Sequence, residues 1–117
     1  MIITEVLVGY LIRNVKRLRQ MKMCSYIVVY DLCKPDRDYQ SLYEMLRSFP
    51  NWGKITESVW CIVSPLSHKD VRDKLMACLD SNDRLLVVET GRCAAWTNVI
   101  ADNEWVRKYI IQDEGVV

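Results

Sequence analysis

The feature that most constrains the fold is the run from Ser25 to Tyr30, which consists almost entirely of β-branched and aromatic residues. A continuous run of this kind is typical of a strand that is buried on both faces. Asp31 follows directly, and a loop of residues 33–37 comes next. The sequence therefore predicts a central strand whose carboxyl end carries an acidic side chain.

Two helices are predicted from the spacing of apolar residues. Between residues 39 and 49 such residues recur every three or four positions, with Asp38 as the expected N-cap. The same spacing recurs between residues 71 and 79, where Ser67 and Asp70 form a start that resembles a capping box.

Further strands are predicted between and after these helices. The stretch Lys54–Ser64 alternates like a strand and contains no turn signal. Because it is long for one strand, it is expected to bend, to bulge or to divide into two. Residues 84–90 form another apolar strand, and a short final helix is expected with Asp102 or Asn103 as its N-cap.

The order of these elements predicts the fold class. Strand, helix, long or double strand, helix and strand is the order of the α+β, ferredoxin-like βαββαβ unit, with a four-stranded antiparallel sheet. Right-handed crossovers place both helices on one face of that sheet. A partner subunit, a ligand or the terminal segments must then cover the other face. With Trp60 and the apolar residues that alternate with it, we expect a homodimer.

The chain divides into a basic extension, residues 1–22, and a single domain, residues 23–117. Residues 1–23 carry five basic side chains against Glu5, a net charge of +4, which leaves −3 for the rest of the chain. The extension is predicted to be an amphipathic segment that packs on the domain, binds a membrane surface or a partner, or precedes the true start at Met21 or Met23. The acidic body argues against a dedicated nucleic-acid binder.

Cysteine and histidine usage excludes other classes. The chain has five cysteines, an odd number, and no two of them are separated by the two residues typical of zinc and redox motifs. His68 is the only histidine. A structural zinc site is therefore not expected, and the chain is predicted to be a reduced, cytoplasmic protein. No apolar run approaches the roughly 20 residues of a membrane-spanning helix.

Asp31 is the strongest candidate for a metal-binding residue. Mg²⁺ prefers hard oxygen ligands and often needs only one or two carboxylates. Two copies of Asp31 across a dimer axis would supply such a pair, whereas a purely structural Asp31 would accept hydrogen bonds from backbone amides of the loop. The four tryptophans could stack on bases, but without interleaved basic residues they are first interpreted as core and interface.

The opening segment from Tyr26 to Leu32 and the motif Glu57-Ser58-Val59-Trp60 resemble the small CRISPR-associated Cas-two family. The chain is most similar to its stand-alone branch, which includes virulence-associated protein D and SinR-like proteins. Residues 80–88 and the later Ala94-Ala95-Trp96 contribute to this resemblance, which extends from about Met23 to Tyr109.

The resemblance implies a ferredoxin-like homodimer with a metal-dependent phosphodiesterase site at its interface. Asp31 matches the metal-binding aspartate of the family, and Arg37 matches the arginines that often follow it. Ser58 and Trp60 match the Ser-Val-aromatic motif, with Trp in place of the usual Phe. The chain departs from the pattern at Lys54, which is all that remains of a basic cluster, and at Glu57, where a Gln is frequent.

Two functional hypotheses follow. The first is an Mg²⁺- or Mn²⁺-dependent endonuclease, acting on RNA rather than DNA, in which Asp31 holds the metal and is the catalytic residue. Its substrate-binding residues would be Tyr30, Arg37, Lys54, Ser58 and Trp60. The second is a non-catalytic dimeric module that binds nucleic acid or a protein partner in a CRISPR-like or toxin–antitoxin system.

Overall fold

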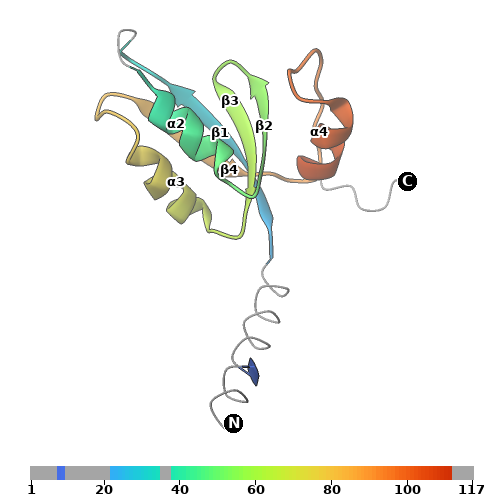
Figure 1. The fold of residues 1–117 in the computed structure, drawn as a ribbon. Helices are drawn as coiled ribbons and strands as arrows, with labels where there is room; N and C mark the ends of the chain where they lie inside the picture. The colour runs from blue at the N-terminus through green and yellow to red at the C-terminus, as the bar shows by residue number, and fades with distance from the viewer. Residues whose placement is uncertain (1–7, 10–21, 35–37, 112–117) are drawn as a thin grey trace.

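The structure is a computed structural model that describes residues 8–9, 22–34 and 38–111. Figure 1 labels the helices and strands of this part of the chain. In chain order they are β1 (Cys24–Asp31), α2 (Gln40–Arg47), β2 (Asn51–Thr56), β3 (Val59–Ser64), α3 (His68–Met76), β4 (Arg84–Glu89) and α4 (Asn103–Tyr109). The predicted N-terminal extension falls outside the described residues except at positions 8, 9 and 22. Within the described ranges, no helix combines the length and apolar character needed to span a bilayer.

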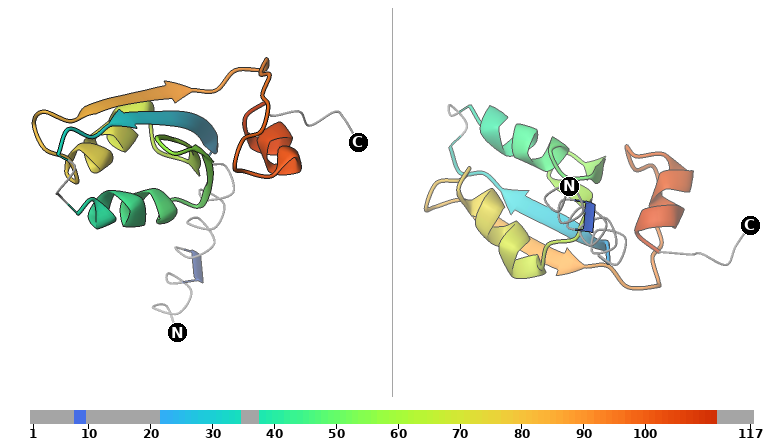
Figure 2. Two further views of the ribbon diagram at one scale, coloured as in Figure 1. Left: turned by 90° about the horizontal axis from the view of Figure 1, so that it is seen from above. Right: turned by 60° about the horizontal axis from the view of Figure 1, so that its bottom comes forward.

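The four strands form one sheet in the order β2-β3-β1-β4, and each neighbouring pair is antiparallel. The predicted α+β class, the βαββαβ order and the antiparallel sheet are therefore confirmed. Helices α2 and α3 lie on the same face of the sheet, as predicted, and α4 lies beside it (Figure 2). Strand β1 is central, which fits its continuous run of strand-forming residues.

The core lies between the sheet and helices α2 and α3. Alternate residues of each strand face the helices. The buried side chains of this layer are Tyr26, Val28, Tyr30, Trp60 and Ile62 from the sheet and Leu42, Leu46, Val71 and Leu75 from the helices. Each fully buried aliphatic side chain of this kind contributes about 1.5–3 kcal/mol. This layer therefore supplies most of the apolar stabilisation of the fold.

The two helix starts in the core layer follow the predicted caps closely. Ser67 is the N-cap of α3, and its hydroxyl oxygen accepts a hydrogen bond from the Asp70 amide at 3.1 Å. In α2 the N-cap position is Tyr39, one residue after the prediction. Asp38 still accepts a hydrogen bond from the Gln40 amide at 2.9 Å, so its carboxylate closes a turn just before the helix.

The long predicted strand divides into β2 and β3, joined by a turn at Glu57-Ser58. Neither turn residue has the positive φ that favours Gly or Asn. Tyr30 stabilises the turn instead, because its amide donates to the Ser58 carbonyl at 3.1 Å and its hydroxyl donates to the Glu57 carbonyl at 3.1 Å. A turn held by a distant residue leaves no local signal in the sequence.

Part of the second sheet face is covered by α4. Gly53 in β2 faces this side, and a Cβ atom at that position would lie only 2.8 Å from the Trp105 ring. The Trp105 indole also donates a hydrogen bond to the Asn51 side chain at 3.3 Å. At the opposite edge, Leu86 and Val88 of β4 remain 56% and 46% exposed on the same face. Among the described residues, α4 thus covers the β2 side of this face, whereas the β4 side stays exposed.

Trp60 does not lie on this second face. Its side chain is only 2% exposed in the layer below α2, where the Arg47 guanidinium lies 5.8 Å from its ring. The expectation that Trp60 faces a partner subunit is therefore wrong. The side chains of paired residues in a sheet point to the same face. Trp60 pairs with Val28, whose side chain faces the helices, so Trp60 faces the helices as well.

Candidate functional site

The candidate site is built around Asp31 at the carboxyl end of β1. Asp31 is the register partner of Arg84, the first residue of β4. One guanidinium nitrogen of Arg84 (Nη1) donates to the carboxylate oxygen Oδ2 of Asp31 at 2.9 Å. The side chains of Arg84 and Asp31 are 78% and 63% exposed. The predicted acidic residue is thus accessible to solvent and neutralised by an arginine from the neighbouring strand.

Asp31 lies at one end of the open sheet face. In β1 it alternates with Tyr30 and so shares a face with Ile27 and Val29. In β4 the residues on this face are Arg84, Leu86 and Val88. The ion pair therefore borders the exposed apolar side of the sheet.

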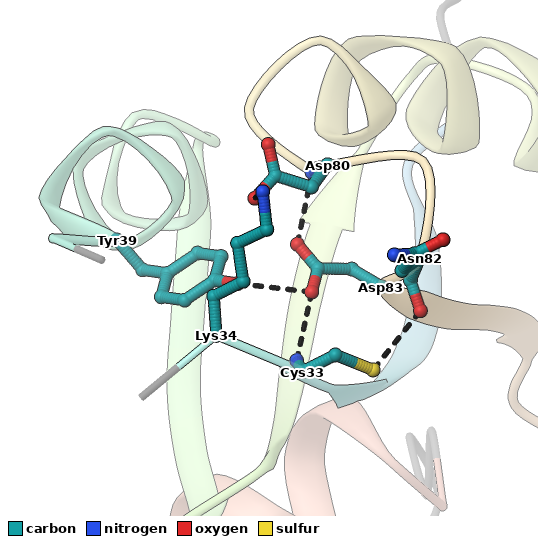
Figure 3. A network of polar contacts seen from close by, with 6 residues as sticks. All are labelled: Cys33, Lys34, Tyr39, Asp80, Asn82 and Asp83. Atoms are coloured by element: carbon teal, nitrogen blue, oxygen red, sulfur yellow. Dashed lines mark hydrogen bonds and ion pairs between the residues drawn. The ribbon is translucent and has the colours of Figure 1, made fainter. Parts of the chain in front are cut away.

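A second polar cluster fixes the loop that follows Asp31 (Figure 3). Its centre is Asp83, in the loop before β4. Carboxylate oxygen Oδ1 of Asp83 accepts hydrogen bonds from the Cys33 amide at 2.8 Å and from the Tyr39 hydroxyl at 2.9 Å. The other oxygen, Oδ2, accepts from the Asp80 amide at 2.9 Å. Asp83 thereby joins the β1–α2 loop, the start of α2 and the α3–β4 loop.

Two further contacts strengthen the joint between these loops. The Cys33 thiol donates to the Asn82 carbonyl oxygen at 3.0 Å, and the Lys34 ammonium group forms an ion pair with Asp80 at 3.5 Å (Figure 3). Burial and the hydrogen bond to Asp83 both raise the pKa of the Tyr39 phenol, so Tyr39 remains a neutral donor at physiological pH.

The predicted contacts of Tyr30 and Trp60 with substrate do not fit their positions. Both side chains are buried, and the Trp60 indole donates to the Tyr30 hydroxyl oxygen at 3.0 Å. Burial raises the pKa of the Tyr30 phenol, although its hydrogen bond with Trp60 acts in the opposite direction. In this conformation neither ring can stack on a base. Their hydrogen bonds hold β1, β3 and the Glu57-Ser58 turn together.

Lys54 and Ser58 lie on the β2–β3 hairpin. Lys54 in β2 forms an ion pair with Glu57 at 3.3 Å, so the residue that departs from the family pattern also neutralises the remaining lysine. Ser58 is exposed in the turn. In the sheet, strand β1 alone lies between this hairpin and β4, the edge strand at which Arg84 pairs with Asp31. Arg37 lies outside the described residues, so its predicted role remains a prediction.

The described residues contain no group of three or more His, Cys, Asp or Glu side chains that could hold a metal ion. In a single copy of the chain, Asp31 is one accessible carboxylate with an arginine partner. Since hard divalent ions favour carboxylate oxygen, the residue type fits Mg²⁺ or Mn²⁺. Two copies of the chain would supply two such ligands, one Asp31 carboxylate from each.

The five cysteines all lie in the described part of the chain and are free thiols. Cys61 and Cys78 are buried, Cys24 is half-buried, and Cys33 and Cys93 are exposed. Burial raises the pKa of the Cys61 thiol to about 12. His68 is exposed at the first position of α3.

Comparison of the chain with protein-family models, with curated proteins and with solved structures finds no match. The candidate site therefore rests on its own geometry and on the residues that carry the resemblance.

Sequence reasoning did not single out Arg84 or Asp83. In the sequence, Arg84 stands out only as a basic residue at the start of an apolar strand. Asp83 belongs to the Asp80-Ser81-Asn82-Asp83 segment, which is typical of a turn that ends a helix. Their partners lie 53 and 50 residues away in the sequence, and only the pairing of β1 with β4 brings them together.

Proposed function

We propose that this chain is a divalent-metal-dependent phosphodiesterase that cleaves RNA as a ferredoxin-like homodimer of the Cas-two-like kind. The observation that carries the proposal is the position of Asp31. An exposed carboxylate ends the central strand and borders an apolar sheet face on which Leu86 and Val88 are exposed. A carboxylate placed in this way is available to a metal ion and to a second copy of the chain.

The open face supports the proposed dimer. Leu86 and Val88 are both about half exposed on β4, and exposed apolar patches often mark association surfaces. A two-fold axis near this edge would make the same patch face itself and would bring two copies of Asp31 toward one another. The proposed site is thus formed from both subunits.

In this proposal Asp31 from each subunit holds Mg²⁺ or Mn²⁺. Such an ion, when bound, stabilises negative charge on a phosphodiester and lowers the pKa of a coordinated water. Arg84 would exchange its contact with Asp31 for the substrate phosphate, which a guanidinium binds through paired N–H donors. Arg37 would hold a second phosphate, and Lys54 would do so after release from Glu57.

A non-catalytic dimeric binding module is the second candidate. It is favoured by the 2.9 Å ion pair between Asp31 and Arg84 and by the 3.3 Å pair between Lys54 and Glu57. Each pair neutralises a side chain that the nuclease would need. In this candidate, the open face binds a nucleic acid or a protein without cleavage.

The deciding experiment is an RNA cleavage assay with purified wild-type protein, Asp31→Asn and Asp73→Asn. Asp73 is the matched control, because it is a similarly exposed aspartate that pairs with Arg72 at 3.0 Å on α3. Cleavage should need Mg²⁺ or Mn²⁺, stop with a chelator and return when metal is added back. Asp31→Asn should lower the rate at least about 100-fold, since the ion supplies several kcal/mol of charge stabilisation.

The result also separates the two candidates. Equal cleavage by Asp31→Asn and wild type would contradict the nuclease proposal. RNA binding without cleavage, unchanged by metal and by Asp31→Asn, would favour the binding module.

A further inference from the structure

A pocket of about 480 Å³ lies between α4 and the segment that precedes it. Its size falls within the range of small-molecule sites in proteins. The residues that line it are Ala95, Trp96, Thr97, Asn98, Asn103 and Arg107. None of them belongs to the candidate site around Asp31, so the pocket is a separate site.

The walls of the pocket are anchored to the sheet. The Ile100 amide donates to the Ile55 carbonyl of β2 at 3.0 Å, which ties the segment before α4 to the sheet edge. Trp105 fixes α4 from the other side through its contact with Gly53 and its hydrogen bond to Asn51. Because these walls are already fixed, binding of a ligand would cost little conformational entropy of the protein.

Trp96 is the aromatic wall of the pocket. Its indole nitrogen donates to the Asn103 side-chain oxygen at 2.9 Å, which fixes the orientation of the ring. The side chain is half-buried, so one part of the ring remains accessible. The Asn103 amide group keeps its own N–H donors for a ligand.

Arg107 is the cationic wall. It lies four residues after Asn103 on α4, so the two side chains share one helix face about 5–6 Å apart. Among the described residues, Arg107 is exposed and no carboxylate forms an ion pair with it. The acidic residues at the start of α4, Asp102 and Glu104, do not line the pocket.

The anchored pocket combines a flat ring, amide donors and a guanidinium that has no ion-pair partner among the described residues. These groups suit a ligand with an aromatic ring and a nearby anionic group. We propose that this pocket binds a nucleotide, with its base stacked on Trp96 and its phosphate held by Arg107. Base–aromatic stacking and guanidinium–phosphate pairing are the usual contacts of such sites. The ligand is either a free nucleotide or one unit of a single-stranded nucleic acid.

The test follows the indole N–H signals of the isotope-labelled full chain by NMR. The ligands are UMP, AMP, uridine, inorganic phosphate and a short oligouridylate. Trp96→Phe identifies the Trp96 signal, because that signal is missing from its spectrum. It also keeps a flat aromatic ring, so it can replace Trp96→Leu as the binding variant if the leucine disturbs folding. Nucleotides should shift the Trp96 signal and bind at least about fivefold more tightly than uridine or phosphate alone.

Variants test the two walls separately. Trp96→Leu and Arg107→Gln should each weaken UMP binding about fivefold or more, measured for all variants by isothermal titration calorimetry, because Trp96→Leu lacks the indole signal. Trp52→Leu and Arg72→Gln are matched controls, because Trp52 is 39% exposed and Arg72 is an exposed helix arginine. Both controls should bind within twofold of the wild type. Asp31→Asn should also bind normally, so failure of the nuclease proposal leaves this result intact.

The outcomes divide clearly. Oligouridylate that binds tenfold more tightly than UMP supports a strand-binding site, and equal binding supports a free-nucleotide site. No shift of the Trp96 signal with any nucleotide overturns the proposal. Phosphate that binds as tightly as UMP, or Arg107→Gln that binds like the wild type, overturns it as well.

Discussion

Replacement of Asp83 by alanine tests the polar cluster that joins the two loops beside Asp31. The Asp83 carboxylate accepts hydrogen bonds from two backbone amides, those of Cys33 and Asp80, at 2.8 and 2.9 Å. A hydrogen bond to a charged acceptor contributes about 1.5–3 kcal/mol. Because the cluster is partly exposed, the lower end applies, and the two amide bonds together give about 3 kcal/mol. Loss of the Tyr39 contact acts in the same direction.

This loss in the free energy of unfolding should be measured by urea titration, with far-UV circular dichroism as the signal. For a chain of this length, 1 kcal/mol corresponds to about 4 °C in melting temperature, so in a separate thermal scan Asp83→Ala should also melt about 12 °C lower. The slope of the urea transition should not change, since the folded domain buries the same surface.

Two controls make the result specific to Asp83. Asp73→Ala removes an exposed carboxylate from α3 and should change stability by no more than about 0.5 kcal/mol. In a double-mutant cycle, Asp83→Ala and Tyr39→Phe should be less than additive, because both remove the same hydrogen bond. A loss below about 1 kcal/mol for Asp83→Ala, or full additivity with Tyr39→Phe, would refute the cluster as a stabilising joint.

Three other changes test the fold. Ser67→Ala removes the cap bond to the Asp70 amide and should cost about 1 kcal/mol in urea unfolding, whereas Ser67→Asp should not. Gly53→Ala pushes a methyl group into the Trp105 ring, so it should destabilise the domain by about 1–3 kcal/mol and alter the near-UV circular dichroism of the tryptophans. Wild-type stability and an unchanged spectrum would mean that α4 does not pack against β2. Because burial raises the pKa of the Cys61 thiol from 9.0 to about 12, the folded state keeps this proton after the unfolded state has lost it. Stability should therefore fall between pH 9 and pH 12, and Cys61→Ala should make that fall shallower; an unchanged pH profile would contradict the assignment.

The order of helices and strands was predictable because its signals are local. The run before Asp31 marks a buried central strand, and Ser67 with Asp70 marks a helix start, whatever the rest of the chain does. Periodicity and capping depend on residues within a few positions of one another. The α+β class followed from the order of these elements alone.

The position of the candidate site was predictable only in part. The sequence indicated Asp31 as an acidic residue at a strand end, and the structure places it there, exposed. It did not indicate which side chain would neutralise Asp31, nor that Trp60 faces the helices. Both depend on strand register, since a shift by one residue turns every side chain to the opposite face.

What the sequence by itself determined is thus the set of elements and the residue type at the end of β1. What only the tertiary structure decided is every contact between distant segments: the Glu57-Ser58 turn held by Tyr30, the pairing of Arg84 with Asp31, and the joint at Asp83. Local patterns report how each residue interacts with its near neighbours. These other contacts arise only when the sheet brings together residues that lie tens of positions apart, and no single segment contains that information.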